Sequence, residues 1–312
     1  MYLLDRPELS DSPEQIYEKC VKKYRDSPDK VAKLLSCKAL VKQDADRYEA
    51  LIRAGNSFPK PELPGGMKAA EMYCVYDEKF AKSRTAGRKA YYDKIKEPVN
   101  GKVCPVCGEK GKITLDHFLP KSEYPTLCVA PDNLIPICLE CNTEKGTKSE
   151  SKGYGLPIHL YFDRIPEVTV DGQKRHVPYL YVRLGQNFEA EYYVECPPEW
   201  NEVLRRRLSD QMGIYDLCMR FGGFAVIEMG HLETSWQQNI KSLREDLNDL
   251  GMDTSILEDK DLFAMYLKSR LRGELVLDTN SWKTALYRAW HENADRLLEW
   301  FRKKAEAKPA CT

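Results

Sequence analysis

The 312-residue sequence has no net charge, because 48 Lys and Arg residues balance 48 Asp and Glu residues. This balance argues against a protein that coats nucleic acid, so phosphate binding would have to come from a local basic patch. No apolar run approaches the roughly 18 residues that suggest a membrane span, and the N-terminus lacks a signal-peptide pattern. We therefore expect a cytoplasmic protein with no membrane partner and with enough residues to bury a core.

Cysteines are present, but in a number that disfavours a disulfide framework. Eleven is an odd number, and the chain shows no export signal. Seven are scattered, whereas four form two Cys-x-x-Cys pairs, Cys104 with Cys107 and Cys138 with Cys141. Four thiolates at this spacing can hold a structural Zn²⁺ in tetrahedral geometry, and Gly108 allows a tight turn after the first pair. A redox role fits a single such pair better than two pairs in one short segment.

Helical patterns occupy the first third of the chain. Residues 1–66 contain a helix start with proline at the first helical position, at residues 12–13, and they end in the Pro- and Gly-rich stretch 55–66. This stretch is the best candidate for a domain boundary. Residues 67–96 then follow a helical period and become increasingly basic, which predicts one leading basic helix.

Residues 164–312 are predicted to contain two β-hairpins followed by a helical bundle. Strand-like runs flank the turn signals Asp171-Gly172 and 184–187. Farther along, aromatic stripes at helical spacing, such as Trp282 and Trp290, are far more typical of a packed core than of a ligand platform.

Between the two cysteine pairs, the stretch "ITLDHFLPKS" reads as a short strand that ends in Asp116-His117. Adjacent residues of a strand point to opposite faces unless the strand bends or bulges. A carboxylate can bind Mg²⁺ through oxygen, and a neutral imidazole can take a proton from water near neutral pH. The alternative is that Asp116 caps a turn and His117 packs within the zinc subdomain. On these two residues alone, both interpretations stay open.

The neighbouring motifs favour the catalytic interpretation. Asn133 begins the stretch "NLIPICLECN", and Asn142 and the pair Lys145-Gly146 follow the last cysteine. Together with Cys-x-x-Cys and Asp-His-x-x-Pro-Lys-Ser, this ordered set resembles the HNH nuclease family, also called the ββα-metal nucleases, in its zinc-stapled form. The resemblance covers about residues 100–163. Asn142 stands where the family's eponymous final histidine would be.

The resemblance implies a role for each matching residue. His117 would be the general base that activates water, and Asn133 would brace the loop and orient His117. Asp116 and Asn142 would hold a catalytic Mg²⁺ (or Mn²⁺), because an amide oxygen is a suitable hard ligand. The cysteines would hold structural Zn²⁺, and Lys145 would contact phosphate unless it is a solvated lysine. The products would carry a 5′ phosphate and a 3′ hydroxyl.

A local basic patch surrounds these motifs. From Lys79 to Lys152, 14 Lys and Arg residues stand against 9 Asp and Glu residues, a net charge of +5 (14 − 9), so the remainder of the chain carries −5. The candidates for nucleic-acid contacts are Arg88, Lys89, Lys112, Lys121 and Lys145. A solvated helix face explains any single one of them equally well. Tyr91 and Tyr92 could stack on bases, although packing is the favoured reading.

Fold and function follow as expectations. We expect an α+β, mainly α fold in which a small ββα-metal nuclease core (67–163) with a structural zinc lies between an N-terminal helical region (1–66) and a C-terminal hairpin and helical domain (164–312). The expected function is a metal-dependent HNH endonuclease that nicks or cuts DNA, an effector of bacterial anti-phage defence. The alternative is a catalytically silent zinc module that binds nucleic acid or a partner protein. The helical remainder would restrain the nuclease, bind a partner such as a separate ATPase, or form a homodimer.

Overall fold

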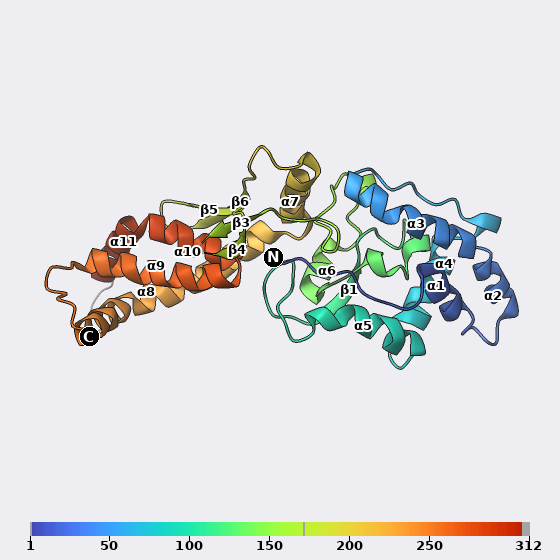
Figure 1. Ribbon diagram of the computed structural model, residues 1–312, viewed down its shortest axis with the longest axis horizontal. Helices are drawn as coiled ribbons and strands as arrows, with labels where there is room; N and C mark the ends of the chain where they lie inside the picture. The colour runs from blue at the N-terminus through green and yellow to red at the C-terminus, as the bar shows by residue number, and fades with distance from the viewer. Residues whose placement is uncertain (1, 171, 308–312) are drawn as a thin grey trace. The chain divides into compact units, whose positions relative to one another are not determined.

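The computed structural model describes residues 2–170 and 172–307 and divides into two compact units. Unit 1 comprises Met1–Arg164 and Asn201–Tyr215, and unit 2 comprises Ile165–Trp200 and Asp216–Thr312. The expected mainly helical α+β class is confirmed, with three two-stranded antiparallel hairpins among the described residues (Figure 1). The predicted domain bounds at residues 66 and 163 stay predictions.

Unit 1 is built from short helices around one hairpin. Its helices are α1 (Pro13–Val21), α2 (Pro28–Leu35), α3 (Lys38–Ala54), α4 (Ala69–Val75), α5 (Asp93–Lys96), α6 (Leu139–Lys145) and α7 (Glu202–Ile214). Two π-helical turns are η2 (Tyr76–Phe80) and η3 (Arg88–Tyr92). Its 3₁₀ turns are η1 (Pro64–Gly66), η4 (Glu97–Val99), η5 (Pro125–Leu127), η6 (Pro131–Asn133) and η7 (Glu150–Lys152).

The helix start predicted at residues 12–13 is confirmed. Pro13 is the first residue of α1, and the Ser12 backbone N–H donates to Gln15 Oε1 at 2.9 Å. This bond satisfies one of the backbone donors that a helix N-terminus leaves free.

The single basic helix predicted over residues 67–96 is wrong. The chain forms α4 and η2, breaks at residues 81–85 where Arg84 has a φ of +64°, and resumes at residue 86, ahead of η3 and α5. A Cβ atom at Gly87 would lie 2.3 Å from the Lys79 carbonyl oxygen, so glycine permits the fold-back. The Phe80 and Tyr91 rings then stack at 5.9 Å. Helical periodicity is retained on both sides of the break, which is why the sequence pattern conceals it.

The hairpin of unit 1 pairs β1 (Ile113–His117) with β2 (Leu134–Cys138), and α6 follows β2 at once. The register runs regularly from Ile113 opposite Cys138 to His117 opposite Leu134. Because the ladder has no bulge, alternate side chains lie on opposite faces of β1. Leu115 packs in the hydrophobic core formed with α1, α4 and the two π-helical turns. The side chain of Asp116 therefore faces away from that core and that of His117 faces toward it.

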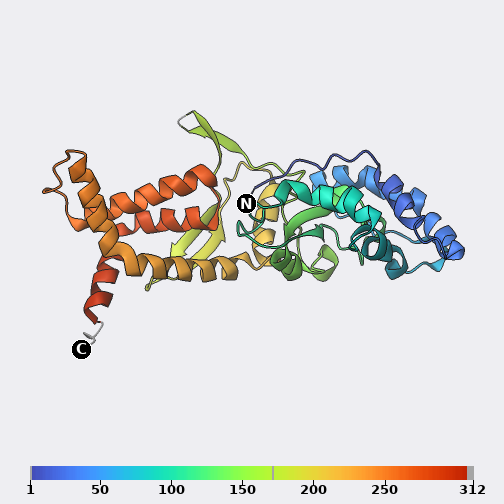
Figure 2. The same cartoon turned by 90° about the horizontal axis from the view of Figure 1, so that it is seen from below.

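Unit 2 contains the two predicted hairpins and a helical bundle. Strand β3 (Glu167–Val170) pairs with β4 (Gln173–His176), and β5 (Leu180–Leu184) pairs with β6 (Ala190–Val194). Of the predicted first turn, Asp171 lies outside the described residues. The β3–β4 hairpin projects as a separate ribbon, and β3 is exposed along its length (Figure 2).

The bundle of unit 2 consists of α8 (Leu217–Asp249), α9 (Asp259–Leu277), α10 (Trp282–Glu292) and α11 (Ala294–Ala307). The aromatic stripes form its core, as predicted: Trp290 is fully buried, and the Trp236 and Phe301 rings stack at 6.2 Å. Among the described helices, none has both the length and the apolar character that crossing a bilayer would require.

Helix α7 belongs to unit 1 through a buried ion pair. Arg207 Nη1 donates to both carboxylate oxygens of Asp163, at 2.8 and 2.9 Å, and Nη2 donates to the Ile52 carbonyl. The Arg207 side chain is only 1% exposed. A buried guanidinium is tolerated only where several acceptors satisfy it. Arg207 therefore connects α7 both to the end of α3 and to Asp163.

We expect Arg207→Ala to lower the free energy of unfolding by about 3–5 kcal/mol, because it leaves Asp163 without its buried counter-charge. The matched control is Arg206→Ala, since Arg206 is exposed and donates to the Gly55 carbonyl at 3.3 Å. Arg206→Ala should lower the free energy of unfolding by about 0.5 kcal/mol or less. Denaturant unfolding of both variants measures the difference, and equal losses would contradict the structural role assigned to Arg207.

Candidate nuclease site and metal centre

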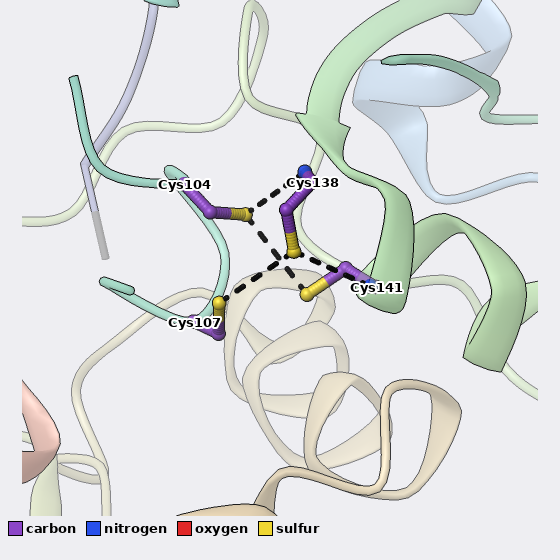
Figure 3. Close-up of side chains that lie close together, drawn as sticks. All are labelled: Cys104, Cys107, Cys138 and Cys141. Carbon is purple, nitrogen blue, oxygen red and sulfur yellow. Dashed lines mark hydrogen bonds between the residues drawn. The ribbon is translucent and has the colours of Figure 1, made fainter. Parts of the chain in front are cut away.

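The four paired cysteines form one cluster. Their sulfur atoms lie within 4.8 Å of one another, and all four side chains are buried. Cys104 and Cys141 sulfurs are 3.9 Å apart, and Cys107 and Cys138 sulfurs are 3.8 Å apart. A tetrahedron with Zn–S bonds of about 2.3 Å has sulfur–sulfur edges of about 3.8 Å. Figure 3 shows the four sulfurs gathered around a common centre, so the cluster fits Zn²⁺ in its closed structural form.

Backbone N–H groups support the sulfurs. The Cys138 N–H donates to Cys104 Sγ at 3.3 Å, and the Cys141 N–H donates to Cys138 Sγ at 3.4 Å. A hydrogen bond with Cys107 lowers the pKa of the Cys104 thiol to about 7, which favours the thiolate that a metal binds. Gly108 has a φ of +78°, as its predicted place in the tight turn requires.

Asp116 and Lys145 form a buried ion pair on the α6 face of β1. Lys145 Nζ lies 2.9 Å from Asp116 Oδ2 and 3.1 Å from Oδ1, with hydrogen-bond geometry only to Oδ1, and it also donates to the His117 carbonyl at 2.6 Å. Asp116 Oδ2 is buried and has no hydrogen-bond partner among the described residues. Burial raises the pKa of Asp116, and the Lys145 charge opposes that rise.

The place of Lys145 differs from both alternatives that the sequence suggested. Its side chain is 1% exposed, so the ammonium is directed to the interior of the site and contacts neither solvent nor a phosphate from outside. Lys145 lies three residues after Asn142 in α6, and residues three apart share a helix face. Both side chains therefore contact β1, and Lys145 reaches the end of the strand.

His117 lies on the opposite face of β1, where it is 8% exposed. Its Nε2 is 2.9 Å from the Cys128 carbonyl oxygen. A carbonyl only accepts, so Nε2 carries the proton and Nδ1 is the basic nitrogen. The Tyr76 ring of η2 meets the imidazole edge-on, at 4.4 Å between centroids. Burial lowers the pKa of His117 to about 3, which keeps the ring neutral near pH 7.

Asn133 is fully buried and links the two ends of the loop between β1 and β2. Its Oδ1 accepts from the Leu119 N–H at 2.8 Å, and its Nδ2 donates to the carbonyls of Leu119 and Leu127 at 3.0 and 3.3 Å. These are backbone bonds of the kind expected from a bracing asparagine. Leu127 directly precedes Cys128, whose carbonyl binds His117.

Asn142 lies in the first turns of α6 beside β1. Its Nδ2 donates to Thr114 Oγ1 at 2.9 Å and to the Leu115 carbonyl at 3.3 Å. Because these bonds use the amide nitrogen, the oxygen is the end of the amide that a metal would use. Thr114 and Asp116 share one face of β1, so the oxygen-donor residues Asp116 and Asn142 lie on the same side of the hairpin. Carboxylate and amide oxygens are the donor set that fits Mg²⁺.

The predicted nucleic-acid residues divide into two groups. Lys89 and Lys112 are exposed. Arg88 donates to the Ala81 carbonyl at 2.5 Å and stacks on Tyr92, and Lys121 pairs with Asp77. Tyr91 and Tyr92, at 6% and 7% exposed, pack in the core. Of these four basic side chains, those of Lys89 and Lys112 are the ones exposed for a contact with phosphate.

Sequence reasoning missed the residues that surround the site from outside the motif. Tyr48 contacts Asn133, His159 contacts Tyr48, and Tyr76 contacts His117. None has a spacing that marks it, since Tyr48 precedes Asn133 by 85 positions. For His159, the only signal is its place in "PIHLYFD" (157–163), which directly follows the densest part of the motif.

Cys138→Ser should remove structural zinc and destabilise unit 1, because three thiolates and a hydroxyl do not form the closed site. Elemental analysis should fall from about one zinc per chain to near zero, and the thermal midpoint should drop. Cys218→Ser, an exposed cysteine of unit 2, should keep both values. Full zinc content in Cys138→Ser would refute the assignment.

Comparison with known proteins agrees with this geometry. Residues 104–148 match the model of the family described as HNH endonuclease. The chain is 24% identical over 266 residues to protein ea31 of Escherichia phage lambda, covering 81% of this chain and 85% of that protein. It is 31% identical over 93 residues to Septu protein PtuB of Bacillus thuringiensis, covering 30% of this chain and 32% of that protein. No solved structure matches it.

The matched segment begins at the first cysteine of the cluster and ends three residues after Lys145. It therefore contains the cluster, both strands of the hairpin, the loop between them and α6. Residues 104–148 of this chain are an HNH endonuclease domain built on a four-cysteine cluster.

Proposed function

We propose that the protein is a Mg²⁺- or Mn²⁺-dependent endonuclease that hydrolyses DNA phosphodiester bonds by nicking or double-strand cleavage. The observation that carries the proposal is the position of Asp116 and His117 at the end of β1, with Asn142 of α6 bound to the same strand through Thr114 and the Leu115 carbonyl. A zinc ribbon with a purely structural role needs none of these three residues.

The chain supplies the general base. His117 Nδ1, unprotonated and in a neutral ring, takes a proton from the attacking water. The bond from Nε2 to the Cys128 carbonyl fixes the tautomer and the ring plane. Asn133 keeps that carbonyl in place through its bond to Leu127.

Asp116 and Asn142 would hold the catalytic metal. When bound, Mg²⁺ supplies positive charge that stabilises the crowded phosphate and the leaving 3′ oxygen. Before binding, Lys145 neutralises Asp116, so Asp116 has to share or exchange this partner when it binds the metal. An imidazole at position 142 would favour softer ions, whereas the amide favours hard ones.

Substrate approach is proposed along the basic patch defined above by residues 79–152. Lys89 and Lys112 would contact the phosphate backbone, and Arg88 and Lys121 would join them after leaving their present partners. Because Tyr76 covers His117, the turn η2 has to move before a phosphate reaches Nδ1. Two π-helical turns and an interrupted helix in this segment are compatible with such movement, since π-helical turns recur at functional sites.

We propose a role in conflict between bacteria and phages, within the cytoplasm. The similarity to a Septu protein supports defence, and the similarity to protein ea31 of phage lambda shows that a phage carries a similar protein. By the family resemblance, the partner is a separate ATPase or another subunit of the system, or a second copy of the chain. Unit 2 lies outside the HNH domain and would provide that contact.

His117→Ala should reduce plasmid nicking by about 10²–10⁴-fold, the usual contribution of a general base. The readout is the conversion of supercoiled to open-circular DNA with Mg²⁺ or Mn²⁺, alongside zinc content. His231→Ala, an exposed histidine of unit 2, should cleave as the wild type does. Equal residual activity in His117→Ala with zinc retained would overturn the proposal and favour the zinc module that binds nucleic acid or a partner protein.

A further inference from the structure

We propose that Tyr48 of α3 is a positioning residue for the nuclease reaction, acting on His117 through Asn133. The inference rests on the proposed function and extends it to a helix that begins 66 positions before the matched HNH segment (104 − 38). It assigns the N-terminal region a direct part in the geometry of the site.

The Tyr48 hydroxyl is the link to the loop that connects the two strands. It donates to Asn133 Oδ1 at 3.1 Å, and both side chains are almost completely buried. The same Oδ1 accepts from the Leu119 N–H, so two donors fix the plane of the amide. With the oxygen held, Nδ2 can only point toward the carbonyls of Leu119 and Leu127.

A buried histidine sets the direction of the hydrogen bonds. The Tyr161 N–H donates to His159 Nδ1 at 3.4 Å, so the proton of this neutral ring lies on Nε2. Nε2 lies 3.2 Å from the Tyr48 hydroxyl and therefore donates to it. The hydroxyl proton is then directed to Asn133. The chain of donors runs from Tyr161 through His159 and Tyr48 to Asn133.

Helix α3 holds the same loop at a second point, one turn earlier. Thr126 Oγ1 donates to Asp44, which is fully buried, and Thr126 lies in η5 next to Leu127. Residues four apart share a helix face, so Asp44 and Tyr48 act together from one side of α3. Two bonds from one rigid helix fix residues 126–133, and these include Cys128, whose carbonyl orients His117.

The ring of Tyr48 packs independently of its hydroxyl. Its centroid lies 5.9 Å from that of Phe58 and 6.0 Å from that of Phe162. Tyr48→Phe therefore keeps the aromatic contacts and removes the hydroxyl, which is the donor to Asn133 and the acceptor for His159. A matched control is Tyr17→Phe, because the Tyr17 hydroxyl is equally buried and donates to the Leu34 carbonyl at 3.0 Å, in the core around α1.

The test is plasmid nicking under saturating DNA, comparing wild type, Tyr48→Phe, Tyr17→Phe, Asn133→Ala and the double variant Tyr48→Phe/Asn133→Ala. Tyr48→Phe should lower kcat by about 10- to 100-fold, the scale of a small misplacement of a catalytic group, with KM unchanged. The double variant should cleave no more slowly than Asn133→Ala alone, since both changes interrupt one pathway. Tyr17→Phe should keep the wild-type kcat.

Amide hydrogen exchange separates positioning from general loss of stability. Exchange at residues 118–133 should rise in Tyr48→Phe and stay at the wild-type level in Tyr17→Phe. A wild-type kcat in Tyr48→Phe, or losses that multiply in the double variant, would overturn the inference and leave the nuclease function standing. Absence of cleavage by the zinc-loaded wild-type protein would overturn the proposed function and this inference together.

Discussion

The four-cysteine cluster is the constraint on which the rest of the site depends. A two-stranded hairpin is marginal by itself, and here β1 and β2 are five residues each. Cys138 ends β2 and Cys141 lies in the first turn of α6, so the cluster fixes where α6 begins and which way it turns. The start and direction of α6 place Asn142 against Thr114 and Lys145 against Asp116. The arrangement of side chains on the α6 face of β1 is therefore a consequence of the cysteine positions.

The other face of β1 depends on a different set of contacts. His117 lies against the Cys128 carbonyl and the Tyr76 ring, both of which belong to the core shared with the N-terminal helices. The proposed base His117 and the proposed metal ligand Asp116 are adjacent in sequence yet have separate partners. His117 contacts the Cys128 carbonyl and the Tyr76 ring, whereas Asp116 pairs with Lys145 of α6. The matched HNH segment has 45 residues (104–148), whereas unit 1 has more than 160. The contacts of His117 account for part of this difference, because they include Tyr76, which lies outside the matched segment.

Much of this arrangement could be predicted from local sequence. The cysteine spacing predicted the cluster, the Asp116-His117 pair predicted the end of a strand, and alternation predicted the hairpins of unit 2. The burial of Lys145 could not be predicted, because it depends on how α6 docks on β1. The break in the basic helix depends on a close approach between Gly87 and Lys79. The role proposed for Tyr48 could not be predicted either. It depends on a contact with Asn133, 85 residues later, and a single sequence carries no signal for such a contact.

The most direct test of the account is to incubate supercoiled plasmid with zinc-loaded protein and Mg²⁺, quench with EDTA, and treat the purified product with DNA ligase and ATP. The account predicts open-circular DNA only in the presence of Mg²⁺ or Mn²⁺. It also predicts that ligase reseals the nicks, because hydrolysis leaves a 5′ phosphate and a 3′ hydroxyl. Plasmid that stays supercoiled, or nicks that ligase cannot reseal, would contradict it.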